Sequence, residues 1–133
     1  MLTRIFLSIA ILFTFTISSY SNVKTGSLTV GDKVTDFTIT NYDGATYTLS
    51  NSGSKYTVII FMSTECPFVQ PYTDRLINLT NQFCSQGIAF WGINSNNTEP
   101  TEQVMNHATD RKYNFPVLKD NDNVVADLFG AAR

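Results

Sequence analysis

Cysteine and histidine are scarce in this chain of 133 residues, which contains two cysteines and one histidine. Two cysteines are too few for a small domain held together by several disulfides. Cys66 and Cys84, even together with His107, also fall short of the ligand set of a structural zinc site. Cysteine therefore serves here for reactivity or for packing, and we expect no metal.

Charged residues are few as well, at 15% of the sequence, and the basic ones are scattered singly or in pairs. Because there is no basic stripe and the formal net charge is -2, nothing in the sequence would hold a phosphate backbone, and we expect no nucleic-acid partner. Hydrophobic residues make up 43% of the chain, whereas glycine and proline are limited. This composition and length predict one folded domain of ordinary size.

A single long apolar run, residues 5–17, stands at the N-terminus behind one positive charge. Small residues follow it, and Ser19 and Ser21 match the pattern that precedes a signal-peptide cleavage site. We therefore interpret residues 1–21 as a secretory signal peptide and residues 22–133 as a domain that is exported, with no stable membrane insertion after cleavage. The run is short for a membrane span, and an uncleaved N-terminal membrane anchor is the alternative.

The remaining sequence predicts strands before and after a helix. Residues 29–49 alternate partly between apolar and polar side chains around a turn at Asp43-Gly44, as a β-hairpin does. Residues 56–62 and 88–93 are apolar without alternation, which is typical of strands that are covered on both faces. We expect the first of these two strands in the centre of a sheet.

A long amphipathic helix is predicted to begin beside Cys66. Pro67 suits its first position, Pro71 should kink it or make its first turn irregular, and Gly87 ends it. Its apolar side chains recur every three or four residues: Phe68, Tyr72, Leu76, Leu79 and Phe83.

Further elements follow the second strand. A helix is predicted from about residue 99 to 112, a short strand at residues 115–118, and a short helix at residues 124–129. A strand, helix, strand order requires a parallel sheet, and open parallel sheets carry their sites at the carboxyl ends of their strands. Cys66 lies at such an end.

The position of Cys66 favours reactivity. The thiolate is the reactive form of cysteine, and a helix N-terminus favours that charged form. Ser63 and Thr64 could add hydroxyl donors, whereas Glu65 opposes the effect through its like charge. The alternative is a buried, inert cysteine, which is common for free thiols.

Several short motifs occur in the order that a known family shows. They are Gly31-Asp32-Lys33, Asp36-Phe37, Asp43-Gly44, Cys66-Pro67, Gly87-Ile88, Phe115-Pro116-Val117 and Gly130. In this order, over about residues 28–133, the sequence resembles redoxin domains of the alkyl hydroperoxide reductase and thiol-specific antioxidant type, in the thioredoxin-like superfamily. The resemblance implies an α/β thioredoxin-like fold with an N-terminal β-hairpin and a βαβα core. The C-terminal strands and the closing helix of that fold would then be missing after Arg133.

The resemblance also implies an activity. Cys66 would stand at the reactive position, supported by Ser63, Thr64 and Pro67, and no metal or organic cofactor is needed. Cys66 would attack a peroxide or a protein disulfide and be regenerated by an external thiol reductant. We therefore expect an exported thiol-dependent oxidoreductase or peroxidase with antioxidant activity. The alternative is a catalytically silent thioredoxin-like binding module.

Three departures from the family's patterns limit this expectation. Val69 stands where thioredoxins carry the second cysteine of Cys-x-x-Cys, so a self-contained dithiol cycle is absent. Ile59 stands where peroxiredoxins carry a proline ahead of the hydroxyl residue, which weakens the peroxidase interpretation. Gln70 stands where copper-carrying relatives have a second cysteine, and this argues against copper.

The other candidates receive ordinary roles. Cys84 would lie about 27 Å from Cys66 along a continuous helix, too far to resolve it, and we interpret it as a core residue near the helix end. His107 is expected on a solvated helix face. Aromatic side chains are expected in the core, although two of them, Phe68 and Tyr72, could line the rim of the site. The missing strands would leave a sheet edge unpaired, which favours self-association.

Overall fold

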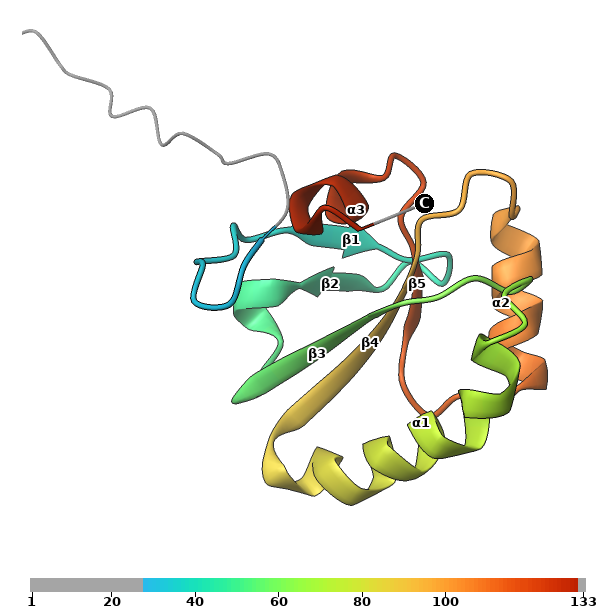
Figure 1. The fold of residues 1–133 in the computed structure, drawn as a ribbon, viewed down its shortest axis with the longest axis horizontal. Coiled ribbons are helices and arrows are strands. Elements are labelled where there is room, and N and C mark those ends of the chain that lie inside the picture. The colour runs from blue at the N-terminus through green and yellow to red at the C-terminus, as the bar shows by residue number, and fades with distance from the viewer. Residues whose placement is uncertain (1–27, 132–133) are drawn as a thin grey trace, which may run out of the picture.

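The computed structural model describes residues 28–131, which fold into three layers around a small parallel sheet (Figure 1). The sheet contains β3 (Tyr56–Phe61), β4 (Ile88–Asn94) and β5 (Val117–Lys119), with β4 in the middle. β3 pairs with β4 in parallel from Tyr56 opposite Ile88 onward, and β4 pairs with β5 from Gly92 opposite Val117 onward. All three carboxyl ends therefore lie at the same edge of the sheet.

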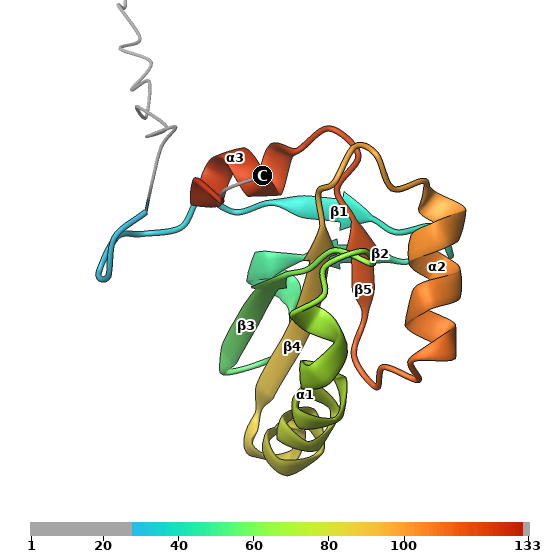
Figure 2. The same ribbon diagram turned by 45° about the vertical axis from the view of Figure 1, so that its right-hand side comes forward.

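Helices cover one face of this sheet. α1 (Val69–Phe83) runs from β3 back to β4, and α2 (Thr101–Asp110) connects β4 to β5. A short 3-10 turn, η2 (Cys84–Gln86), follows α1, and Gly87 ends it with a left-handed backbone, φ 78°. Both helices stand on the same side of the strands in Figure 2.

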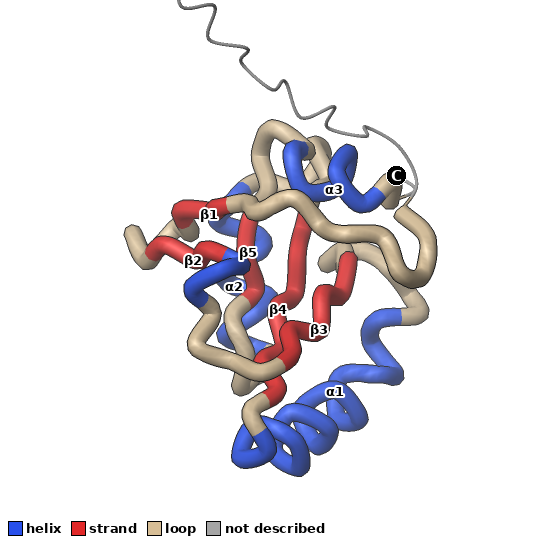
Figure 3. Tube along the Cα trace, turned by 90° about the vertical axis from the view of Figure 1, so that its left-hand side faces the viewer, coloured by secondary structure: helices blue, strands red, loops and turns tan. Residues whose placement is uncertain are grey.

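The opposite face is covered by a hairpin and a short helix. β1 (Thr38–Thr40) and β2 (Thr46–Thr48) pair antiparallel, and η1 (Leu49–Asn51) leads on toward β3. α3 (Val124–Phe129) lies beside the hairpin on this face, as Figure 3 shows from the side. The result is a hairpin and helix layer, a sheet layer and a layer of two helices.

Side-chain alternation along β4 feeds two separate cores. Trp91 and Ile93 face the hairpin and α3, where they pack with Phe37 and Leu118. Phe90 points to the other face, into the core beneath α1 and α2. Because successive side chains of a strand point to opposite faces, one apolar strand can serve both layers. The absence of alternation in residues 88–93 thus has a direct structural cause.

The predicted elements are present with shifted ends. The hairpin, the two long parallel strands and the three helices occur where the sequence predicts them, but the short third strand starts at Val117 instead of residue 115. α1 starts at Val69, so Pro67 lies in the preceding turn and not at the first helical position. Pro71 consequently falls in the first turn of α1, where its missing N–H removes no intrahelical bond. At this position Pro71 requires neither a kink nor an irregular turn.

Two expectations are wrong, one about the place of a strand in the sheet and one about burial. β3 lies at an edge of the sheet and not in its centre, because within residues 28–131 a strand pairs with it on one side alone. Phe68 and Tyr72 are not core residues, because they are 77% and 52% exposed. The alternative, that they line the rim of the site, stays a prediction. Self-association through the second edge of β3 stays a prediction.

The segment interpreted as a signal peptide, residues 1–21, lies outside the described residues. Among residues 28–131, no helix has the length and apolar character needed to cross a membrane.

Candidate active site

Cys66 ends a tight turn that follows β3. The amide of Cys66 donates to the carbonyl oxygen of Ser63 at 3.4 Å, and the amide of Val69 donates to the carbonyl of Cys66 at 3.1 Å. Two consecutive turns therefore carry the chain from the strand into α1. The Cys66 thiol is half-buried and makes no disulfide.

A buried carboxylate, Glu99, lies beneath this turn. It stands just before α2 and is 1% exposed. The hydroxyl of Ser63 donates to Glu99 Oε1, and the amide of Thr64 donates to Glu99 Oε2 at 2.9 Å. The amide of Glu65 approaches Glu99 Oε1 at 3.4 Å. Glu99 thus accepts hydrogen bonds from three consecutive residues of the turn.

Two asparagines complete the shell around Glu99. Asn94 Nδ2 donates to Glu99 Oε2 at 2.5 Å, and Asn96 Nδ2 donates to Glu99 Oε1 at 3.0 Å. Asn94 Nδ2 also donates to the carbonyl of Met62 at 3.2 Å, which ties the end of β4 to the end of β3. The carboxyl ends of two parallel strands therefore converge on one carboxylate.

These hydrogen bonds determine the charge of Glu99. Burial alone would raise the pKa of this carboxyl, but hydrogen bonds from Ser63, Thr64 and Asn94 outweigh that effect and lower the pKa from 4.5 to about 2. Glu99 is therefore ionised at every pH at which the protein is expected to work.

A buried lysine, Lys119, balances this charge from the end of β5. Its Nζ donates to Asn94 Oδ1 at 2.9 Å and to the carbonyl of Asn96 at 2.7 Å. Burial lowers the pKa of Lys119, while attraction to Glu99 and Asp120 opposes the shift. The asparagine amide thus bridges a cation and an anion, and both remain hydrogen-bonded, as buried charges must be.

The helices hold the turn from its other side. Gln103 of α2 donates to the hydroxyl of Thr64 at 2.6 Å, and Gln70 of α1 donates to the carbonyl of Thr64 at 3.2 Å. His107 contacts Gln70 at 3.4 Å and is half-buried, contrary to the expectation of a solvated residue. Burial and the neighbouring Arg111 lower the pKa of His107, so the ring is neutral at pH 7.

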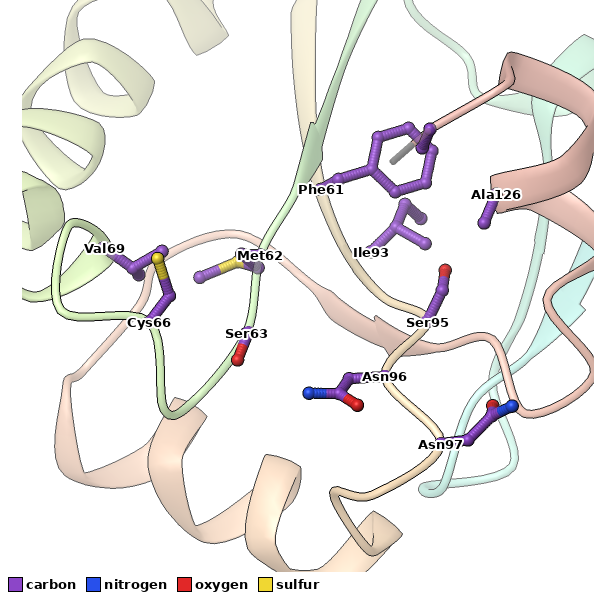
Figure 4. Close-up of a pocket in the computed structure, with 11 residues that line it drawn as sticks. Phe61, Met62, Ser63, Cys66, Val69, Ile93, Ser95, Asn96, Asn97 and Ala126 are labelled. Carbon is purple, nitrogen blue, oxygen red and sulfur yellow. The ribbon is translucent and has the colours of Figure 1, made fainter. Parts of the chain in front are cut away.

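A cavity of about 400 Å³ opens beside the Cys66 thiol. One part of its wall is apolar and another part is polar, so it could accept an apolar group next to a polar one. Figure 4 shows the sulfur of Cys66 beside Met62 and Val69, and it shows Ser63 and Asn96 in the polar part of the cavity wall. The lining residues are Phe61, Met62, Ser63, Cys66, Val69, Ile93, Ser95, Asn96, Asn97, Ala126 and Ala131.

Direct support of Cys66 by Ser63, Thr64 and Pro67 stays a prediction. Ser63 and Thr64 direct their hydroxyls to Glu99 and Gln103, so they hold the turn in place. Pro67 is exposed in the second turn. Cys84 is exposed where α1 ends and η2 begins, which corrects its interpretation as a core residue. Among residues 28–131, no three potential metal-ligating side chains gather.

Sequence reasoning missed the polar shell beneath the turn, namely Asn94, Asn96, Glu99, Gln103 and Lys119. The rule that places sites at the carboxyl ends of parallel strands points to more than Cys66. Applied to all three strands, it points to Asn94 at the end of β4 and Lys119 at the end of β5.

Comparison with known proteins places this geometry in a family. The sequence model of the AhpC/TSA family matches residues 30–133. No curated protein matches the chain.

Solved structures share its fold. A hypothetical protein from Sinorhizobium meliloti is 32% identical, with a TM-score of 0.71 over 79% of this chain and 61% of that one. A conserved protein from Geobacillus kaustophilus is 34% identical, with a TM-score of 0.71 over 77% of this chain and 58% of that one. The chain thus spans about three fifths of the length of these two proteins. A secreted disulfide oxidoreductase from Mycobacterium tuberculosis is 22% identical, with a TM-score of 0.60 over 70% of this chain and 66% of that one.

Proposed function

The chain belongs to the AhpC/TSA family and has a thioredoxin-like α/β fold, and from this premise we propose that it is a thiol oxidoreductase whose reactive group is Cys66. One observation carries the proposal: Cys66 stands between β3 and α1, at the edge where all three parallel strands end, and lines a cavity. Ligand sites of open parallel sheets lie at this edge. Cys84 has no such setting.

The chemistry follows from a single thiol. The Cys66 thiolate attacks one sulfur of a protein disulfide, an S–S bond forms, and the other sulfur leaves as a thiolate. With a peroxide, the thiolate attacks one oxygen, the O–O bond breaks, and Cys66 becomes a sulfenic acid while water or an alcohol leaves. In either case an external thiol supplies the electrons that restore Cys66. Because Val69 stands where thioredoxins carry a second cysteine, no neighbouring thiol can perform this step.

The two cysteines supply a matched pair of variants. We expect Cys84→Ser to react with hydrogen peroxide and with a model disulfide at the rate of the unchanged chain, and Cys66→Ser to lose this reaction. The consumption of oxidant in the presence of dithiothreitol measures turnover, and mass spectrometry locates the modified sulfur. Equal reactivity of the two variants would contradict the proposal.

The alternative function is a binding module that keeps the scaffold without turnover. The observation that favours it is Val69 at the position of a resolving thiol. Under this alternative, Cys66 in the folded chain would react with neither peroxide nor disulfide, although it would still be alkylated after unfolding.

We also propose that the protein is exported. Residues 1–21 have the pattern of a signal peptide, and one solved structure of the same fold is described as a secreted disulfide oxidoreductase. N-terminal sequencing of the protein from cell fractions tests this proposal: cleavage after Ser21 is expected. A chain that begins at Met1 in the membrane fraction would instead indicate an N-terminal anchor.

A further inference from the structure

Glu99 accepts hydrogen bonds from all three residues that precede Cys66 in the turn after β3. A buried carboxylate is costly, and here its two oxygens are used to hold Ser63, Thr64 and Glu65 in one conformation. Cys66 is the next residue, and its own amide bonds back to the first residue of the same turn. Whatever fixes this turn therefore also fixes the position of the thiol.

We propose that Glu99 is a positioning residue for Cys66: its buried carboxylate clamps the Ser63–Cys66 turn and thereby keeps the thiol half-buried at the mouth of the cavity. This inference rests on the proposed function, because it concerns the same thiol. It adds a residue that is 33 positions away in the sequence and whose hydrogen bonds go to the three residues before Cys66 and to two asparagines.

The clamp is supported from two sides. On one side Asn94 and Asn96 fix the carboxylate, so its oxygens cannot turn away from the turn. On the other side Gln103, one helical turn further along, bonds to Thr64. Glu99 and Gln103 thus hold the turn at two points, and a rotation of the turn would break the hydrogen bonds to both residues at once.

The charge of Glu99 indicates that its effect is geometric. A second negative charge near a thiolate disfavours that thiolate, so Glu99 does not activate Cys66 electrostatically. Ionisation instead strengthens the hydrogen bonds to the turn, because bonds to a charged acceptor are shorter and stronger than neutral ones. If Glu99 acts through geometry, shortening its side chain should change the exposure of the Cys66 thiol. If it acted through charge, neutralising the side chain should change the reactivity of that thiol and shortening it should not.

The test uses the alkylation of the folded chain by iodoacetamide, with Cys84 as an internal reference. Mass spectrometry gives the ratio of the Cys66 rate to the Cys84 rate in one sample. Glu99→Asp keeps the charge but cannot reach all its donors, whereas Glu99→Gln keeps the length but loses the charge. Ser63→Ala removes one donor from the turn side and provides a folded variant if changes at residue 99 do not fold.

Two control variants lie in α2, which follows Glu99 directly. Glu102→Gln removes the same charge from the exposed first turn of α2. Val104→Ala leaves the turn untouched but opens a cavity at a fully buried site, so it reproduces a general loss of stability.

We expect the labelling ratio to rise at least about threefold in Glu99→Asp and in Ser63→Ala, because a released turn exposes the thiol. The exchange of the Thr64 amide should accelerate about tenfold relative to amides of β4, since that amide loses a charged acceptor. Glu102→Gln and Val104→Ala should leave the ratio within about twofold of the unchanged chain.

Three results would overturn the proposal. The first is a ratio that stays unchanged in both Glu99→Asp and Ser63→Ala. The second is a rise in Glu99→Gln alone, which would assign the effect to charge. The third is an equal rise in Val104→Ala, which would assign it to general loosening. None of these measurements uses peroxide or disulfide, so an unreactive Cys66 would refute the proposed function and leave this test in force.

Discussion

At the scale of single residues, the carboxyl of Glu99 makes the stability of the protein depend on pH. Its pKa is lowered from 4.5 to about 2 in the folded state, because its hydrogen bonds to Ser63, Thr64 and Asn94 outweigh the effect of burial. The unfolded chain therefore binds a proton at a higher pH than the folded chain does. The resulting stabilisation is complete above about pH 5 and is lost as the pH falls toward 2.

The first prediction follows from this linkage. The difference in the free energy of unfolding between the unchanged chain and Glu99→Gln should shrink by about 2 kcal/mol between pH 6 and pH 3. Urea unfolding at several pH values measures it. Glu102→Gln, which changes an exposed carboxylate three residues further on, in α2, should show a much smaller change. A difference that is independent of pH would mean that Glu99 is not ionised in the folded protein.

Lys119 gives a second prediction at this scale. Lys119→Met removes one of the two donors to Asn94 Oδ1, the other being the Asn96 amide at 3.3 Å, and leaves Glu99 without the buried cation. It should therefore cost about 3 kcal/mol of stability. In the Glu99→Gln background the same change should cost at least about 1 kcal/mol less, because no buried anion remains. Additive costs in this double-mutant cycle would show that the two charges do not interact through Asn94.

At the scale of elements, the close approach of β4 to its neighbours depends on Gly92. A Cβ atom at this position would lie 2.6 Å from Met62 Sδ and 3.3 Å from Phe115 Cε2, which is too close for the first pair. The absence of a side chain thus lets Met62 pack over the central strand just before the turn that carries Cys66.

We therefore predict that Gly92→Ala lowers the free energy of unfolding by about 2 kcal/mol through overpacking. Thermal or urea unfolding measures the loss. Met62→Ala removes the colliding sulfur, so the added cost of Gly92→Ala in that background should be clearly smaller. An equal cost in both backgrounds would place the strain elsewhere.

The elements also show what the sequence could predict. The spacing of apolar residues in α1 and the unbroken apolar run of β4 reflect local periodicity, and both were predicted to within a few residues. The sequence misplaces the start of α1, because Pro67 is compatible with a helical first position but the preceding turn donates hydrogen bonds to a distant residue, Glu99. Contacts between residues far apart in the sequence leave no local pattern, and the hydrogen bonds that join Glu99 to Ser63, Thr64 and Glu65 are such contacts.

At the scale of the whole molecule, the length of α1 keeps the two cysteines apart. α1 contains 15 residues, and Cys66 precedes it while Cys84 follows it. At 1.5 Å per residue the helix alone is about 22 Å long. A disulfide requires Cα atoms within about 7 Å, so the two thiols cannot pair inside one folded chain.

We therefore predict that oxidation by hydrogen peroxide gives a sulfenic acid at Cys66 or disulfides between two chains, and not a Cys66–Cys84 bond within one chain. Non-reducing electrophoresis separates monomers from linked dimers, and mass spectrometry after blocking of free thiols identifies the paired sulfurs. Cys84→Ser is the control, because it should still form the Cys66 sulfenic acid, which a dimedone probe traps. Efficient formation of the bond within a monomer would contradict this prediction, because it would require α1 to unfold during oxidation. Cys84 would then be the resolving cysteine, a role that Val69 cannot fill.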